Sequence, residues 1–386
     1  MTVLKIKIYS NTIIMIILFS CILVYLPLFK SSYAIKNDNN EHEFNYIFDP
    51  SQYMEYKDEK EETIIYDNLN NQANENKRSE SQINKIKEIK ITKKSNTIAN
   101  NIVEEPNDNI NSTNYNFIAV GDWYCNEETK RTINNILEQY PELIITTGDQ
   151  VKESPSASCW IEMSEPIKDK MKIAIGNHDV EFANIYKQII DYHNVKNPYY
   201  SHDFQNVHYI SMSTEHPFEE GSKQYEFIKS DLEKISKNQD IDWIIVHNHK
   251  ALYSTRNDME VAEELRNTYH PLFEKYNVDL VISSHNQYYE RTYPLLYNHE
   301  DDQEPIILDN TESNYSNTKG IIFLTVGTGG DELQDIIYKE DYYIIQKEKY
   351  GFLNLKLEND RKTLVGEFRT GNDDDDILDN FKLTKS

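Results

Sequence analysis

Side chains that bind metal ions stand at the ends of five short apolar runs in this 386-residue chain: Asp122, Asp149, Asn177, His249 and His285. Two carboxylates, an amide and two imidazoles suit divalent or trivalent ions of intermediate hardness, such as iron, zinc or manganese. Any one of these residues alone would be an ordinary turn aspartate or surface histidine. Their shared position after apolar runs instead predicts a metal centre.

The apolar runs predict the strands that would position these ligands. They are short, rich in β-branched residues and bounded by residues that break strands; they read NFIAV, ELIITT, MKIAI, DWIIV, VDLVISS and GIIFLTV. Helical patterns lie among them at 127–139, 223–237 and 259–276. Strands that alternate with helices predict an α/β fold. Because ligands bind beyond the carboxyl ends of the strands in such sheets, the metal site is expected at those ends.

Motifs between about residues 115 and 330 resemble those of calcineurin-like metallophosphoesterases. They are GD at 121–122, GD at 148–149, GNHD at 176–179, a histidine after a strand at 249, and H-x-x-x-Y-E-R at 285–291. Within that family the pattern is most similar to the purple acid phosphatases. The resemblance implies a β-sandwich flanked by helices, with the metal site at the strand C-terminal ends. It also implies hydrolysis of phosphate esters, in which two cations clamp the phosphate and activate water.

The resemblance assigns a role to each metal ligand. Asp149 would bridge two metal ions, and three further residues would complete the shell of the second metal: Asn177, His249 and His285. Asp122 would bind the first metal. One or two ions of iron, zinc or manganese per chain are therefore expected.

Other motif residues are expected to act beside the metals. By the same resemblance, His178 would contact the substrate phosphate or act as a general acid, and Asp179 would orient it. Arg291, in the last motif, is expected to support its loop, with a contact to substrate phosphate as the alternative.

The shell of the first metal departs from the family pattern at two positions. Gln287 stands where the family has a metal-binding histidine, and Lys152 stands where purple acid phosphatases have a metal-binding tyrosine. Three accounts remain open. Lys152 replaces part of the first metal's charge by pairing with Asp122 and Asp149. Alternatively, Tyr124 supplies a substitute ligand, or the domain binds phosphate esters without cutting them.

Composition divides the chain into four segments. Residues 1–35 hold an apolar run at 12–29 that follows lysines, and they are expected to be a signal peptide or an uncleaved membrane anchor. Residues 36–112 are polar and expected to form a disordered tether. The metallophosphoesterase domain is expected at 113–370, followed by an acidic, solvated tail at 371–386. We therefore expect an exported chain that is secreted or held at the outer face of a membrane through its N-terminal segment alone.

Charge and cysteine content bear on the partners and the compartment. The 65 acidic and 40 basic residues give a formal net charge of −25. This balance argues against a nucleic-acid partner, which needs a basic face, and favours a small phosphate ester. In an exported chain, Cys125 and Cys159 either form a disulfide or stay free.

These observations predict a metal-dependent hydrolase of phosphate esters, acting on monoesters outside the cytoplasm. The alternative is a catalytically impaired metallophosphoesterase-like domain that serves as an extracellular binding module. The complete ligand set of the second metal favours the enzyme, whereas Lys152 and Gln287 favour the binding module.

Overall fold

The computed structural model describes residues 3–7, 43–47, 115–152, 154, 156–256, 258–358, 361–370 and 376–386, and it divides into two compact units, 1–107 and 108–386. In the first unit, β1 (Val3–Lys7) and β2 (Glu43–Ile47) pair antiparallel. The expected disordered tether is therefore wrong for β2, whose aromatic and β-branched residues favour a strand. The apolar run at 12–29 and the rest of the tether lie outside the described residues.

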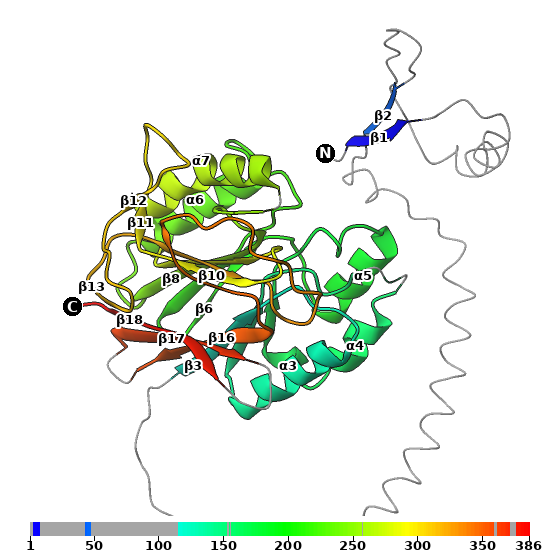
Figure 1. Cartoon of the computed structure of the whole chain (residues 1–386), viewed down its shortest axis with the longest axis horizontal. Coiled ribbons are helices and arrows are strands. Elements are labelled where there is room, and N and C mark those ends of the chain that lie inside the picture. The colour runs from blue at the N-terminus through cyan, green and yellow to red at the C-terminus, as the bar shows by residue number, and fades with distance from the viewer. Residues whose placement is uncertain are drawn as a thin grey trace, which may run out of the picture. The chain divides into compact units, whose positions relative to one another are not determined.

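The second unit contains two seven-stranded sheets (Figure 1). The strand order in the first sheet is β13 (Asn314–Ser316), β18 (Ile377–Thr384), β17 (Thr363–Thr370), β16 (Gly351–Leu357), β3 (Tyr115–Val120), β4 (Leu143–Thr146) and β5 (Met171–Ile173). The order in the second sheet is β15 (Tyr343–Lys347), β10 (Tyr289–Thr292), β14 (Ile322–Val326), β9 (Leu280–Ser284), β8 (Trp243–Lys250), β7 (Val207–Ser211) and β6 (Tyr200–Phe204). Parallel pairing joins β3, β4 and β5 in one sheet, and β7, β8, β9 and β14 in the other.

Alternate residues of β8 face opposite sides of their sheet, as the pleat of a strand requires. Trp243 and Ile245 lie in a large apolar cluster with residues of the first sheet, whereas Ile244 and Val246 lie in a second cluster with α6 and α7. The two sheets therefore pack face to face. The predicted sandwich of sheets flanked by helices is confirmed.

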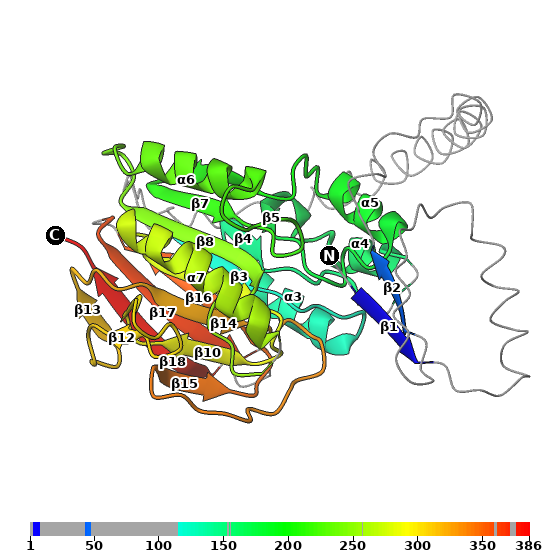
Figure 2. The same ribbon diagram turned by 90° about the horizontal axis from the view of Figure 1, so that it is seen from above.

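Helices cover both sides of this sandwich (Figure 2). α6 (Lys223–Ile235) and α7 (Met259–Lys275) pack on the second sheet. Beside the first sheet lie α3 (Glu127–Glu138), α4 (Ser158–Ser164) and α5 (Ala183–Tyr192), and a 3-10 turn (Lys168–Lys170) precedes β5. The three helices that the sequence predicts are therefore present. A small pair, β11 (Leu295–Leu296) and β12 (Ile306–Ile307), lies apart from the main sheets.

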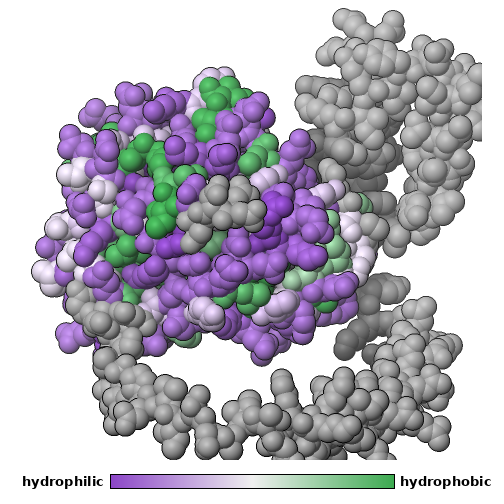
Figure 3. Space-filling view, turned by 60° about the horizontal axis from the view of Figure 1, so that its bottom comes forward, coloured by the Kyte–Doolittle hydropathy of each residue, from purple (hydrophilic) through white to green (hydrophobic). Residues whose placement is uncertain are grey.

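The face of the second unit that Figure 3 shows is mostly hydrophilic. Hydrophobic residues form only scattered patches on this face. Of the helices within the described residues, not one combines the length and apolar character needed to cross a membrane.

The C-terminal segment corrects one prediction. An acidic, solvated tail was expected at 371–386, but Ile377–Thr384 forms β18, which pairs with both β17 and β13. Alternate residues of β18 face the core: Phe381 is fully buried and Leu383 is 3% exposed. The period-2 pattern of this segment therefore outweighs the acidic residues that precede it.

A buried ion pair connects β18 to the second sheet. Arg291 in β10 is 1% exposed, and its Nε and Nη2 donate to the two carboxylate oxygens of Asp379 at 2.6 and 2.8 Å. The Tyr289 hydroxyl donates to the same carboxylate at 2.6 Å. Arg291 therefore fastens β10 to β18, and the alternative contact with substrate phosphate is wrong because its guanidinium is buried against Asp379.

We predict that Asp379→Ala lowers the free energy of unfolding by about 3–5 kcal/mol, because it leaves the buried Arg291 guanidinium without its counter-charge. Urea denaturation measures this loss. Asp376→Ala is the matched control, since Asp376 is an exposed aspartate just before the same strand, and its change should stay within about 0.5 kcal/mol. Equal losses in the two variants would contradict the assignment.

Candidate metal centre

The predicted ligands follow parallel strands of both sheets. Asp122, Asp149 and Asn177 come after β3, β4 and β5 of the first sheet. His249 lies near the end of β8, and His285 comes directly after β9, in the second sheet. The site is therefore built where the carboxyl ends of the two sheets meet, as expected.

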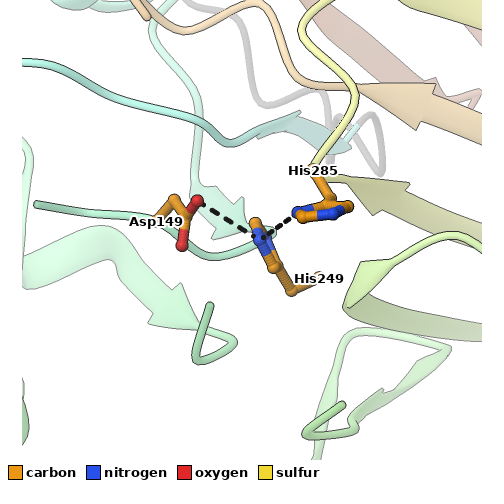
Figure 4. Close-up of side chains that lie close together, drawn as sticks. All are labelled: Asp149, His249 and His285. Carbon is orange, nitrogen blue, oxygen red and sulfur yellow. Dashed lines mark hydrogen bonds and ion pairs between the residues drawn. The ribbon is translucent and has the colours of Figure 1, made fainter. Parts of the chain in front are cut away.

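His249 lies at the centre of this cluster and is fully buried. Its Nδ1 donates to the Thr147 carbonyl at 2.9 Å, so the lone pair of Nε2 faces the other ligands. Three ligand atoms surround Nε2, namely Asn177 Oδ1 at 2.9 Å, His285 Nδ1 at 3.2 Å and Asp149 Oδ2 at 3.3 Å. Figure 4 shows Asp149 and His285 directed at His249 from either side.

The donor atoms in this cluster fit a metal ion. Those of Asp149, His249 and His285 all lie within 4.8 Å of one another. Atoms that carry lone pairs repel at such distances unless a hydrogen or a cation lies between them. Burial alone would lower the pKa of His249, but the Asp149 and Asp122 carboxylates outweigh it and raise that pKa to about 10. The cluster therefore attracts a cation, and a proton supplies the charge when no metal is bound.

The backbone at three ligands adopts an uncommon conformation. Asp122, Asp149 and His285 have φ angles of 57°, 51° and 71°, in the left-handed region that few residues other than glycine adopt. Gly148, with φ of 101°, precedes Asp149, and a Cβ there would lie 2.6 Å from His249 Nδ1. Each strained non-glycine residue costs about 1–3 kcal/mol, and such residues cluster at functional sites. The strained backbone therefore lies at the residues whose side chains converge on the candidate metal site.

Gln287 lies beside Asp122, as the motif alignment predicts, but it acts as a donor. Its Nε2 lies 2.8 Å from Asp122 Oδ1 and 3.0 Å from the His285 carbonyl. Both partners are acceptors, so the amide nitrogen must face them. The other oxygen of Asp122 accepts the His285 backbone N–H at 2.8 Å. Each oxygen of the carboxylate that would hold a first metal therefore accepts one hydrogen bond.

Lys152 forms an ion pair that sequence analysis missed. Its Nζ lies 2.6 Å from Asp331 Oδ2, and the Asp331 backbone N–H donates to the Asp122 carbonyl at 2.9 Å. The account based on Lys152 named Asp122 and Asp149 as its partners; the structure gives it Asp331. Asp331 follows the Gly-rich turn at 327–330. An acidic residue directly after that turn was the signal in the sequence that could have indicated a partner for Lys152.

Tyr124, the proposed substitute ligand, is half-buried. It lines a cavity of about 210 Å³ together with Asn126, Lys152, Asp331, Glu332 and Tyr350. This cavity adjoins the half of the site that departs from the family pattern, because Asp331 bonds the backbone of Asp122. A ligand role for Tyr124 stays a prediction.

The last two residues of the GNHD motif, His178 and Asp179, lie in different surroundings. The His178 side chain is 28% exposed, its Nδ1 lies 3.4 Å from Glu181 Oε2, and its backbone N–H donates to Asp149 at 3.0 Å. Asp179 is fully buried, and its carboxylate accepts backbone N–H groups of Gln150, Val151 and Gly176 at 2.8, 3.2 and 2.8 Å. The predicted role of orienting His178 is therefore wrong: Asp179 holds together the two loops that carry Asp149 and Asn177.

The disulfide alternative for the cysteines is confirmed. Cys125 and Cys159 are bonded, with Cα atoms 6.1 Å apart. The bond fastens the loop after Asp122 to α4. It thus restrains one of the loops of the candidate centre.

Comparison with known proteins supports the resemblance that the motifs indicate. Residues 115–289 match the calcineurin-like phosphoesterase family. Over 289 residues, the chain is 26% identical to probable inactive purple acid phosphatase 27 of Arabidopsis thaliana, covering 67% of this chain and 45% of that relative. Purple acid phosphatase 22 of the same plant is 26% identical over 56% of this chain and 50% of its own length. The chain thus spans about half the length of these curated relatives.

A solved structure agrees with the fold. The purple acid phosphatase PPD1 of yellow lupin, Lupinus luteus, superposes with a TM-score of 0.59 at 22% identity, covering 71% of this chain and 54% of that one. The resemblance of the chain to the calcineurin-like phosphoesterases, and within them to the purple acid phosphatases, is confirmed.

Proposed function

We propose that this protein is a metal-dependent hydrolase of phosphate esters that works with one metal ion. The observation that carries the proposal is the convergence of four ligands on one point around His249 Nε2: Asp149, Asn177, His249 and His285. A metal ion bound there would polarise the phosphate and lower the pKa of a bound water. Iron, zinc and manganese all suit the ligands.

The residues around the centre have separate tasks in this proposal. His178 follows the ligand Asn177, and its half-buried imidazole would contact the phosphate or pass a proton to the leaving group. Its backbone bond to Asp149 fixes the loop that carries it. Asp122 aligns the His285 backbone and accepts from Gln287, so it organises the site as a hydrogen-bond acceptor.

The substrate we propose is a small phosphate monoester encountered outside the cytoplasm. A net charge of −25 disfavours long polyanions such as nucleic acids at a distance. The Cys125–Cys159 disulfide supports an oxidising compartment, in which such bonds persist.

A direct test is hydrolysis of p-nitrophenyl phosphate by the full chain, produced in an exporting host. We predict activity that a chelator abolishes and that added iron, zinc or manganese restores. His249→Ala should lower kcat/KM roughly a hundredfold or more, because loss of the metal removes several kcal/mol of transition-state stabilisation. His299→Ala is the control, since His299 is exposed and lies outside the centre. A wild-type chain that stays inactive with all three metals would contradict the proposal.

A second candidate is a binding module that retains the ligand set but does not cut. Two observations favour it: the Gln287 amide occupies an oxygen of Asp122, and Lys152 is held by Asp331. One relative, purple acid phosphatase 27, is described as probably inactive.

The double variant Lys152→Tyr with Gln287→His separates the two candidates. It restores both family ligands of the first metal and removes the donor from Asp122. For the hydrolase that we propose, kcat/KM of the variant should stay level or fall, because the native centre already works. A gain of tenfold or more would show that the native site is impaired and would favour the binding module.

A further inference from the structure

We propose that Asp258 is a positioning residue, which fixes the ring and the tautomer of His285 for metal binding. This inference rests on the proposed metal centre. The two nitrogens of His285 face different partners: Nε2 lies 3.3 Å from Asp258 Oδ2, and Nδ1 lies 3.2 Å from His249 Nε2. Figure 4 shows the His285 ring with one nitrogen directed at His249.

The chemistry of this pair determines the tautomer. An ionised carboxylate only accepts hydrogen bonds, so the nitrogen that faces Asp258 carries the proton. The lone pair of neutral His285 is then on Nδ1, which faces the centre. A metal-binding histidine is commonly held in this way by a carboxylate on its other nitrogen.

Asp258 adopts an unusual position to make this contact. It is the N-cap residue of α7, where aspartate commonly accepts a hydrogen bond from the first turn and stabilises the helix by about 1 kcal/mol. Its side chain makes no such bond, and its φ of 51° is in the left-handed region. By contrast, Asn126 and Ser222 do cap α3 and α6, accepting from Thr129 and Tyr225. The Asp258 carboxylate thus forgoes capping and faces His285.

A lysine contacts the same oxygen of this carboxylate. Lys250 follows the ligand His249 on β8, and its Nζ lies 3.1 Å from Asp258 Oδ2. The same Nζ lies 3.5 Å from Glu215 Oε1, and the Lys250 side chain is only 15% exposed. The Asp258 carboxylate therefore contacts both a lysine of β8 and a ligand histidine that follows the adjacent strand β9. Sequence analysis missed it because an aspartate before a helix has an ordinary explanation as a cap.

The test is the Zn²⁺ affinity of the full chain, measured by competition with a chelating dye. Asp258→Ser removes the carboxylate, is too short to reach His285 and still provides an N-cap hydroxyl. We expect Zn²⁺ binding to weaken about 10- to 100-fold, the usual effect of losing such a partner. The metal-free unfolding free energy should change little, since the Asp258 side chain is 44% exposed and makes no cap bond that the variant would lose. Asp258→Asn keeps an acceptor and should recover part of the affinity.

Glu260→Ser is the matched control, because Glu260 is an exposed acidic residue in the first turn of the same helix. Its Zn²⁺ affinity should match the wild type. In ¹⁵N-histidine spectra of the Zn²⁺ form, His285 should bind through Nδ1 and carry its proton on Nε2.

The possible failures are distinguishable. If His249→Ala abolishes Zn²⁺ binding but Asp258→Ser and Asp258→Asn bind as the wild type does, the metal centre stands and the role of Asp258 is wrong. If Glu260→Ser weakens binding as much as Asp258→Ser, the effect is one of general charge and the role is again wrong. A wild-type chain that binds no Zn²⁺ would overturn the proposed centre and this inference together.

Discussion

The structure depends on one electrostatic constraint: several lone-pair atoms are held together around His249 Nε2 in a buried site. Asn177 Oδ1, His285 Nδ1 and Asp149 Oδ2 all lie between 2.9 and 3.3 Å from that nitrogen. Such a cluster is stable when a hydrogen or a cation lies between the lone pairs, because low-polarity surroundings strengthen the repulsion between them. The raised pKa of His249 expresses the same demand through a proton. A fold that builds this cluster is therefore built to hold a cation.

Much of the surrounding structure holds the ligand residues in place despite the free-energy cost of their conformations. The left-handed backbone at Asp122, Asp149 and His285 is strained, and Asp179 ties two ligand loops together through three backbone N–H groups. Farther out, the Arg291–Asp379 pair joins the strand after the last ligand loop to β18 of the opposite sheet. The two sheets are thus connected by core packing and by charges, and the site lies at their shared edge.

The centre is asymmetric in a way that bears on function. On the side of His249, the ligand atoms face one another, and a proton on His249 supplies positive charge when no metal is bound. On the side of Asp122, the Gln287 amide and the His285 backbone N–H already satisfy the carboxylate. We interpret this as the replacement of one cation by hydrogen-bond donors, which leaves a single strong metal position.

Local patterns in the sequence predicted the strand-end ligands, because an apolar run that ends at Asp, Asn or His reveals both the strand and the ligand at its end. The α/β sandwich and the three longest helices were predictable for the same reason. Partners distant in the chain were not: Lys152 and Asp331 are 179 positions apart, and Arg291 and Asp379 are 88 apart. β18 was missed because the acidic run before it dominates the composition of that segment. The role of Asp179 was missed because its position next to His178 in the motif does not reveal where its carboxylate lies.

The central claim is that the chain holds one metal ion. Elemental analysis of the full chain, purified from an exporting host without chelators and supplied with iron, zinc and manganese, tests it most directly. The account predicts one bound ion per folded chain. Two ions per chain would contradict the replacement of the first metal by Gln287 and its neighbours, and none would contradict the centre itself.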